Sequence, residues 1–288
     1  MAALCVENLT YVYGEKSPFE KTAIRNISFN ANSGEIIGII GHTGSGKSTL
    51  IQHFNGLLKA NSGRVLLDGA DIWSEPKNIR SIRFKVGIVF QYPEYQLFEE
   101  TVYKDIAFGP SNMGLSESEI DERVLSTSKM LGIGEELLSK SPFDLSGGEK
   151  RRVAIAGVMA MRPEIIVFDE PTAGLDPIGR DIVLNKIKEY RDITGALVFI
   201  VSHSMEDMAK VADRLLVMNK GEVVMLDETK KVFSESKMLE EIGLNVPQIT
   251  KVFSLLNEKG FDIPKNIFTV NDGVSFLTSY IKEGKAND

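Results

Sequence analysis

The chain has 288 residues, of which 43% are hydrophobic and 25% are charged, a composition that suits a globular protein of one or two domains. Its net charge of -7 argues against a nucleic-acid-binding protein held by bulk positive charge. A single cysteine, Cys5, excludes an internal disulfide, and no stretch approaches the roughly 18 consecutive apolar residues of a membrane span. We therefore expect a cytoplasmic protein that reaches a membrane only by docking onto another protein.

Strands are predicted for most of the first ninety residues. Alternating or continuous apolar residues predict strands over 4–7, 10–13 and 23–29, and a short buried strand over 36–40. A helix is expected to continue from Thr49. After a turn at 61–63, residues 64–67 are expected to enter an antiparallel hairpin, and 86–90 to form another buried strand.

The segment between the strand over 36–40 and its helix fits G-x-x-x-x-G-K-[ST], the phosphate-binding P-loop. Its glycines let the backbone wrap around a polyphosphate, and the N–H groups at the helix start point at that anion. Lys47 adds a charge for the β- and γ-phosphates, and the Ser48 hydroxyl can ligate Mg²⁺. The residues expected to bind the nucleotide here are Gly41, His42, Thr43, Gly44, Ser45, Gly46, Lys47, Ser48 and Thr49.

The apolar period changes to that of helices between Gln91 and about residue 162. Ser116 and Glu119 form a capping-box pattern, which predicts a helix that runs toward residue 132. A second helix is expected from about Gly147 to residue 161, because Pro163 then stops it.

Strands return over 165–168 and 197–201, and a hairpin is expected over 214–226. The strands over 36–40, 165–168 and 197–201 are apolar on both faces, as parallel strands covered by helices are. The sequence thus predicts an α/β domain over 1–236, with a helical subdomain at about 91–162 and an antiparallel β part. Residues 237–288 are expected to form a small, mainly helical appendix.

Two carboxylates, Asp169 and Glu170, directly follow the predicted strand over 165–168. In a P-loop protein the acid at this place organises Mg²⁺, so Asp169 is the predicted metal residue. Glu170 would then face the γ-phosphate and act as general base for the attacking water. A solvated turn is the alternative for two adjacent acids, and the P-loop upstream disfavours it.

Ser146, Gly147 and Gly148 open the second predicted helix. Two glycines at a helix start normally indicate only a flexible N-cap. With bare N–H groups and a hydroxyl, however, this start also has the features of a second anion-binding site. One nucleotide already has a complete phosphate cradle in the P-loop. A second cradle in the same chain makes sense if it closes over a nucleotide that another subunit holds.

Together these motifs resemble those of ABC-type ATPases. Leu-Ser-Gly-Gly-Glu from Leu145 resembles the signature motif of that family, with Glu149 where glutamine is usual. The other matches follow in the family's order from residue 11 to residue 203. They are Tyr13 for the aromatic that stacks on adenine, with Tyr11 as a weaker candidate, Gln91 for the Q-loop, Asp176 for the D-loop and His203 for the switch histidine.

The resemblance implies a P-loop ATPase of ABC type that uses ATP and Mg²⁺. It implies a head-to-tail dimer, in which Ser146 and Gly148 of one subunit contact the nucleotide held by the other. Gln91 would join Ser48 and Asp169 around the metal, and His203 would orient the γ-phosphate and the water. The remaining implied roles are catalysis by Lys47, Gln91, Glu170 and His203, and coupling of the two sites by Asp176.

A finer resemblance covers the segment from Gln91 and the C-terminal residues. Gln91-Tyr-Pro-Glu-Tyr-Gln-Leu-Phe, the run from Thr101 to Pro110 and Gly243-Leu-Asn-Val-Pro are similar to ATPase subunits of energy-coupling factor (ECF) transporters, most of all to the second of their two ATPases. These transporters import vitamins and metal ions such as cobalt or nickel. The resemblance implies a groove after Gln91 for a helix of the membrane T component, with Glu94 paired to an arginine there. An exposed glutamate in a polar loop is an equal alternative for Glu94.

ECF membership would also place the chain at the cytoplasmic face of the cell membrane, beside S components that bind the transported substrate, and away from nucleic acid. The partner ATPase would be an identical or a related chain, and residues 237–288 would either stabilise that dimer or cap the sheet edge. A conventional ABC importer or exporter subunit is one alternative. A soluble ABC ATPase acting on nucleic acid or ribosomes is another, disfavoured because such proteins typically carry a long coiled coil, a zinc module or tandem ATPase halves.

Overall fold

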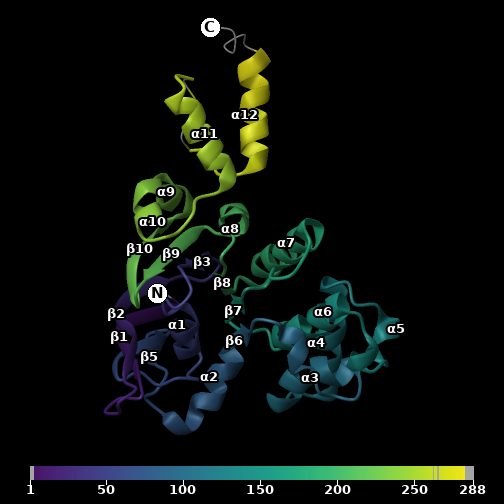
Figure 1. Ribbon diagram of the computed structural model, residues 1–288. Helices are drawn as coiled ribbons and strands as arrows, with labels where there is room; N and C mark the ends of the chain where they lie inside the picture. The colour runs from purple at the N-terminus through teal and green to yellow at the C-terminus, as the bar shows by residue number, and fades with distance from the viewer. Residues whose placement is uncertain (1–2, 262, 265, 283–288) are drawn as a thin grey trace.

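The computed structural model describes residues 3–261, 263–264 and 266–282, and a six-stranded sheet runs through the middle of the molecule (Figure 1). Neighbouring strands in it are parallel except for β10, which pairs antiparallel with β9. In spatial order the strands are β10 (Glu222–Glu228), β9 (Arg214–Asn219), β3 (Ile36–Ile40), β8 (Leu197–Val201), β7 (Ile165–Asp169) and β6 (Val86–Val89).

A second, antiparallel sheet has the order β2 (Lys21–Ala31), β1 (Leu4–Tyr13), β4 (Ser62–Leu67) and β5 (Ala70–Asp71). The predicted hairpin is confirmed by the pairing of β4 with β5, although β4 pairs over a longer stretch with β1. The prediction of two separate strands over 4–7 and 10–13 is wrong. They are one strand with an irregularity at Asn8, whose φ of 49° lies in the left-handed region that asparagine tolerates.

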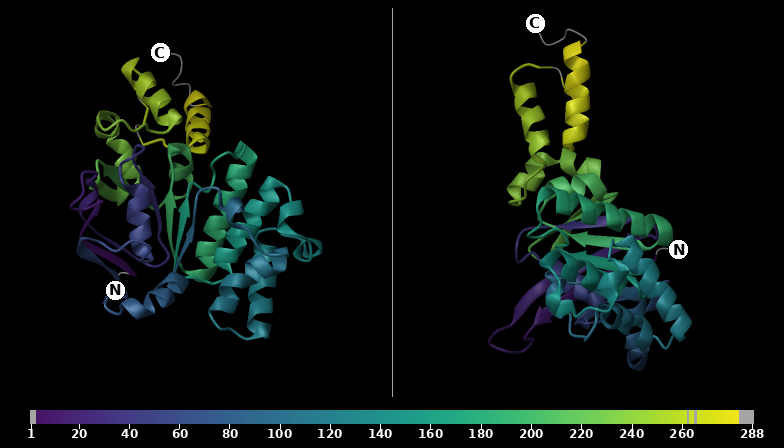
Figure 2. Two further views of the ribbon diagram at one scale, coloured as in Figure 1. Left: turned by 60° about the horizontal axis from the view of Figure 1, so that its bottom comes forward. Right: turned by 90° about the vertical axis from the view of Figure 1, so that its right-hand side faces the viewer.

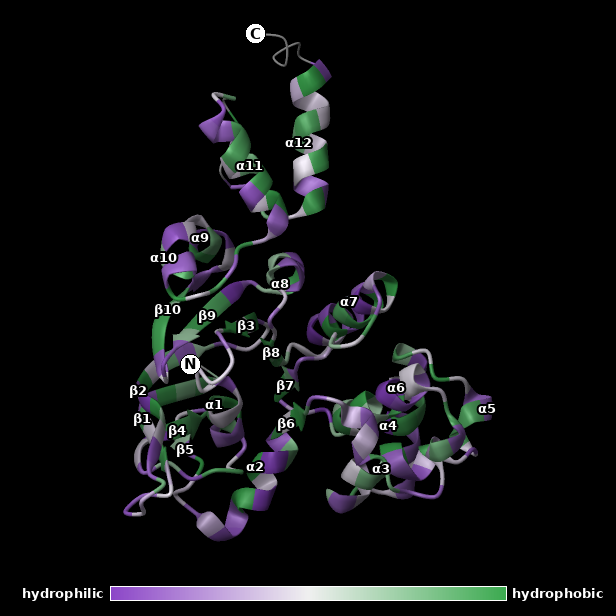
Figure 3. Cartoon of the chain, in the orientation of Figure 1, coloured by the Kyte–Doolittle hydropathy of each residue, from purple (hydrophilic) through white to green (hydrophobic). Residues whose placement is uncertain are grey.

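The buried residues of β3, β7 and β8 alternate between two hydrophobic clusters, one on each face of the central sheet. On one face, Ile37 and Ile39 pack with α1 (Lys47–Phe54) and the antiparallel sheet. On the other face, Ile36 and Ile40 pack with α6 (Gly147–Met159), α7 (Pro177–Thr194) and α8 (Met205–Val211). Helices therefore lie on both faces, as expected, and on the first face the antiparallel sheet shares the cover with α1. Both faces are buried, which explains why these strands are apolar throughout (Figure 3).

The segment from Gln91 to residue 162 is helical, as predicted, and its helices gather beyond the β6 edge of the sheet (Figure 1). The capping box is confirmed, because the Ser116 N–H donates to Glu119 Oε2 at 3.0 Å directly before α4 (Glu117–Met130). The chain enters this group of helices after β6 and returns to the sheet from α6 to β7. The helices before α6 are α2 (Ile79–Lys85), which precedes β6, then α3 (Val102–Asn112), α4 (Glu117–Met130) and α5 (Glu135–Leu138).

The C-terminal helices divide between two cores. Leu239, on α10 (Ser236–Glu241), packs with α9 (Thr229–Ser234) in the main core. Helices α11 (Gln248–Glu258) and α12 (Val270–Lys282) form a hairpin that projects from the molecule around its own small cluster with Phe253 (Figure 2). The domain limit at residues 236 and 237 stays a prediction, and the packing favours a limit after α10. Among the described helices, none is long and apolar enough to cross a membrane.

Candidate active site

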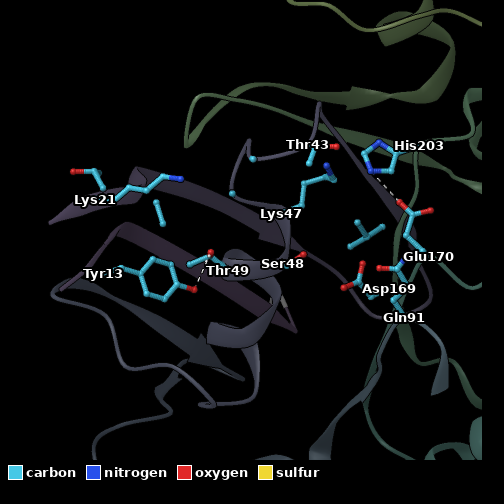
Figure 4. A pocket seen from close by; sticks show the side chains of 15 residues that line it. Tyr13, Lys21, Thr43, Lys47, Ser48, Thr49, Gln91, Asp169, Glu170 and His203 are labelled. Atoms are coloured by element: carbon cyan, nitrogen blue, oxygen red, sulfur yellow. Dashed lines mark hydrogen bonds and ion pairs between the residues drawn. The ribbon is translucent and has the colours of Figure 1, made fainter. Parts of the chain in front are cut away.

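The carboxyl ends of the parallel strands β3, β7 and β8 meet at one edge of the sheet, and a cavity of about 440 Å³ opens there beside β1 and β2 (Figure 4). A crevice at the carboxyl ends of parallel strands is the usual ligand site of such sheets. Predicted residues that line the cavity are Tyr13, Thr43, Gly44, Gly46, Lys47, Ser48, Thr49, Gln91, Asp169, Glu170 and His203. Residues from distant parts of the sequence are thus brought together as the motifs predicted.

The P-loop joins β3 to α1, and its shape depends on Gly46. Gly46 has a φ of 102°, and a Cβ there would lie 2.7 Å from the Ala23 carbonyl oxygen, so only glycine fits. Lys47 begins α1 and folds back over the loop, where its Nζ donates to the carbonyl oxygens of Gly41 at 2.6 Å and His42 at 3.1 Å. Burial lowers the pKa of Lys47, while Glu170 and Asp169 oppose that shift. The loop's own carbonyl oxygens therefore hold the ammonium in place, near two carboxylates.

Some predicted P-loop residues lie behind the cavity rather than on its lining. His42 Nε2 is 3.1 Å from Asn219 Oδ1, and the Ser45 carbonyl oxygen accepts the Gly221 N–H at 3.0 Å. A Cβ on Gly41 would lie 2.5 Å from the Met218 carbonyl oxygen. These contacts fasten the loop to the β9–β10 hairpin. Direct nucleotide contacts of Gly41, His42 and Ser45 stay a prediction.

Glu170 is the first residue after β7, and its backbone has a φ of 52°, which is unusual for a residue other than glycine. Hydrogen bonds on both sides fix this conformation: the Glu170 N–H donates to the Val201 carbonyl oxygen at 2.9 Å. Buried Arg151, on α6, donates to the carbonyl oxygens of Glu170 at 3.3 Å and Ala173 at 2.7 Å. The surroundings thus hold a strained residue in the position that turns its carboxylate into the cavity.

The two acids and the histidine form the polar end of the cavity (Figure 4). Burial raises the pKa of Glu170 to about 7, an effect that the nearby His203 N–H partly offsets. Burial also raises the pKa of Asp169, which Lys47 opposes, and lowers the pKa of His203. Glu170 Oε1 lies 3.4 Å from His203 Nε2 and is buried without a hydrogen bond. A carboxylate with a pKa near neutrality and a free oxygen is suited to accept a proton from water.

Oxygen donors for a divalent cation stand at the same end. Ser48, Gln91 and Asp169 all line the cavity, and they offer a hydroxyl, an amide carbonyl and a carboxylate. Mg²⁺ prefers oxygen ligands and is commonly held by one or two protein groups together with substrate phosphates. The donor set therefore fits Mg²⁺.

Tyr13 lies at the other end of the cavity and is 41% exposed, so its ring is available for stacking. Its hydroxyl is 3.3 Å from Thr49 Oγ1 on α1, and Tyr11 packs edge-on against its ring at 4.8 Å between centroids. Tyr11 packs in turn against buried His53, and it is absent from the cavity lining described here. The structure therefore places Tyr11 beneath Tyr13 as a support.

Three predicted residues lie away from this cavity. Asp176 caps α7, since its Oδ1 accepts the Gly179 N–H at 2.6 Å. Ser146 caps α6, and its N–H donates to Glu149 Oε2 at 2.8 Å. Gly148 belongs to the first turn of the same helix. Their predicted contacts with a nucleotide need a second subunit and stay predictions.

Sequence reasoning missed several residues of this region. Lys21, Thr22, Ala23 and Val201 line the cavity, and Arg151 holds the loop after β7. Lys21 stands opposite Tyr13 in the β1–β2 register, but no sequence pattern predicts that register across a loop of seven residues. Val201 is the last residue of β8, two residues before His203, and this place in the sequence could have indicated that it lies beside the cavity.

Comparison with known proteins agrees with the site. Residues 24–173 match the ABC transporter family. The energy-coupling factor transporter ATP-binding protein EcfA2 of Clostridium tetani is 55% identical over 98% of this chain and 98% of its own. EcfA2 of Caldanaerobacter subterraneus subsp. tengcongensis is 51% identical over 97% of this chain and 98% of its own.

Solved structures give the same result. CbiO1 of Clostridium perfringens, described as part of the ABC transporter complex cbiONQ, has a TM-score of 0.74 and 41% identity, covering 86% of this chain and 97% of its own. The ATP-binding cassette MJ0796, a dimer bound to ADP and Pi, has a TM-score of 0.70 and 28% identity over 78% of this chain and 98% of its own. The chain belongs to the ABC ATPase family, and within it to the ATP-binding subunits of ECF transporters, which bind ATP with Mg²⁺ and hydrolyse it.

Proposed function

We propose that this chain drives the import of vitamins or transition-metal ions such as cobalt or nickel, as the ATPase of an ECF transporter bound to the cytoplasmic face of the cell membrane. It would work with a T component and with S components that carry substrate specificity. The observation that best supports this role is an apolar groove of about 590 Å³ next to the segment that follows Gln91. The naming of its relatives as energy-coupling factor transporter subunits agrees with the groove.

The groove lies between α2 and the helical segment. Phe98 and Phe108 are 57% and 46% exposed, and their rings pack edge-on at 4.9 Å, which leaves apolar surface for a partner. Arg80 and Arg83 line its α2 side. Glu94, on the short turn of helix Pro93–Gln96 that packs on α6, has a buried Oε2 without a hydrogen-bond partner in the described structure. Glu94 does not itself line the groove, but Gln96 of the same short turn does. We propose that an amphipathic helix places its apolar ridge in the groove and an arginine beside it, toward Glu94.

In the hydrolysis that we propose, Glu170 accepts a proton from the attacking water. The water oxygen bonds to the γ-phosphorus as the bond from that phosphorus to the bridging oxygen of ADP breaks. Lys47 binds the phosphate oxygens and stabilises their charge, and His203 orients the γ-phosphate and the water. Ser48, Gln91 and Asp169 would hold Mg²⁺, which neutralises charge on the phosphates.

We also propose a head-to-tail dimer with an identical or a related ATPase. Ser146 and Gly148 are exposed at the start of α6, where N–H groups can bind the partner's nucleotide. Asp176 would link the two sites across the interface. The dimeric MJ0796 cassette supports this arrangement by similarity.

Affinity purification of the tagged chain from its native membranes in mild detergent, with mass spectrometry, tests the transport role. We expect a related ATPase, one T-type membrane protein and several small substrate-binding membrane proteins. Recovery of a conventional permease in their place would favour an ordinary ABC importer or exporter. Recovery of ribosomes or DNA-bound proteins would contradict transport altogether, and both results would leave the ATPase activity standing.

A further inference from the structure

Lys21 is a cation at the mouth of the nucleotide cavity that none of the motifs assigns. It begins β2 and stands directly opposite Tyr13 in the β1–β2 register. Side chains of directly opposed residues lie on the same face of a sheet, about 5 Å apart at their Cβ atoms. Lys21 and Tyr13 both line the cavity, and the Lys21 side chain extends toward the side where Lys47 lies (Figure 4).

The charge of Lys21 is not neutralised within the described part of the chain, where no ion pair or side-chain hydrogen bond involves it. The acidic residues of the adjoining loop are engaged elsewhere. Glu20 Oε2 accepts the Lys16 N–H at 3.0 Å, and Glu15 Oε2 accepts an amide hydrogen of Asn61 at 2.6 Å. The two carboxylates of the cavity, Asp169 and Glu170, stand at its opposite end beside Lys47. Among the described residues, Lys21 therefore has no anionic partner.

Tyr13, the neighbour of Lys21, is held in place by contacts with two other residues. The Tyr13 ring is held from one side by Tyr11, at 4.8 Å between centroids, and its hydroxyl is 3.3 Å from Thr49 Oγ1. Thr49 follows Ser48 in the first turn of α1, at the phosphate cradle. These contacts fix the position of the Tyr13 ring relative to the P-loop. When the base of a nucleotide stacks on Tyr13 and its terminal phosphates enter the P-loop, the phosphate nearest the base lies between these two places.

We propose that Lys21 is a further nucleotide-binding residue, whose ammonium contacts the phosphate nearest the base from the strand side of the cavity. The phosphates are the anionic groups of a nucleotide, and an ammonium offers three donors and no acceptor. Its flexible stem lets it reach an anion from the rim of a site. The contact supplements Lys47, which binds the phosphates farther from the base. It depends on the ATP site described above and not on the transport role.

Lys21→Met tests the proposal, because it keeps the apolar stem and removes the charge. Kd values for AMP, ADP, ATP and adenosine would be measured by competition against a fluorescent ATP analogue, at about 0.05 M and 0.5 M salt. We expect Kd to rise about two- to fivefold for all three nucleotides at low salt, the effect of one exposed ionic contact, with no change for adenosine. The loss should shrink at high salt, since salt screens exposed charges.

Lys21→Arg should bind as the wild type does, and Lys16→Met, in the adjoining loop and outside the cavity lining, is the matched control. Unchanged nucleotide affinity in Lys21→Met would overturn the proposal, as would an equal loss for adenosine, which lacks phosphate. A loss that salt does not reduce, or that Lys16→Met reproduces, would also overturn it. Lys47→Ala is a separate check on the P-loop: if it binds ATP normally, the ATP site itself is misassigned whatever Lys21 does.

Discussion

Glu170 has two features that each lower the stability of the folded protein: a buried carboxylate oxygen without a hydrogen bond and a left-handed backbone conformation. Its side chain is 14% exposed, its Oε1 has no hydrogen bond, and its backbone adopts a left-handed φ of 52°. A buried polar atom without a partner costs about 1–3 kcal/mol, and an unusual backbone conformation adds to that cost. Such a residue persists where function requires it, and here the free carboxylate faces the cavity.

Glu170→Gln should retain ATP binding and lose about 100-fold or more of the hydrolysis rate, because the amide cannot accept the proton from water. Lys47→Ala should instead weaken ATP binding, since it removes the ammonium that the P-loop carbonyl oxygens hold in position. Measurements of ATP affinity and of phosphate release in the two variants separate these effects. Full turnover by Glu170→Gln would disprove the assignment of the base.

The raised pKa of Glu170 predicts how pH acts on stability. A carboxyl whose pKa is about 7 when folded and 4.5 at its ordinary value favours folding below pH 4.5 and loses that contribution as pH rises through 7. Glu170→Gln has no charge to bury, so without nucleotide it should gain about 1–2 kcal/mol over the wild type at pH 8. Thermal unfolding at pH 4.5 and pH 8 checks this, and an equal gain at both values would rule out the charge as its cause.

At the scale of elements, the site depends on where loops leave the sheet. The P-loop, the loop after β7 and the loop after β8 leave adjacent strands at the same edge, so Lys47, Glu170 and His203 converge. Helix α6 adds Arg151, which reaches into the loop after β7. The same helix begins at the predicted site for the partner's nucleotide and packs on the turn that carries Glu94. Helix α6 therefore connects the loop after β7, the proposed dimer interface and the groove.

Glu94→Arg should abolish or strongly reduce capture of the T component, because the new positive charge would repel the arginine that we propose pairs with Glu94. Glu135→Arg, an exposed acid of the same helical segment, is the control for added charge and should assemble normally. Co-purification of the T component with each variant measures the effect. If Glu94→Arg assembles as well as Glu135→Arg does, the groove is not the docking site.

For the whole molecule, the proposed dimer decides which surfaces close over a bound nucleotide. The described chain places Ser146 and Gly148 outside its own cavity, on the exposed start of α6. A second subunit is what would bring that start to an ATP. The projecting α11–α12 hairpin, with Val270 and Val274 62% and 58% exposed, offers a further exposed surface (Figure 2).

Gly148→Asp tests the dimer. A Cβ on Gly148 would meet only Arg152 Nη1, at 3.9 Å, so the monomer should fold and bind ATP normally. In a Glu170→Gln background the added carboxylate should repel the partner's phosphates and weaken ATP-driven dimerisation at least about tenfold. Ser118→Asp adds the same charge at the equivalent place in the capping box of α4 and should leave dimerisation intact. Analytical ultracentrifugation with and without ATP distinguishes the two, and a dimer unaffected by Gly148→Asp would contradict the head-to-tail model.

Local patterns determined much of this protein from the sequence by itself. The P-loop and the Asp169–Glu170 pair are short, contiguous motifs, and the capping box at Ser116 sets a helix start with residues three apart. Each is recognisable from residues that are neighbours in the sequence, so its presence could be predicted without a fold. The left-handed backbone of Glu170 could not, because Val201 and Arg151 hold it. The convergence of the motifs followed from parallel strands whose carboxyl ends share an edge.

Contacts between distant segments decided the rest. The antiparallel sheet covers one face of the central sheet, and β1 continues through Asn8 because it pairs with β2 on both sides of that residue. Arg151 on α6 binds the loop after β7. All of these contacts join residues that are far apart in the sequence. The placement of Lys21 beside Tyr13 depends in the same way on the register of β1 with β2. A one-residue slip would turn Lys21 to the other face of that sheet, and only packing of the folded chain selects the register.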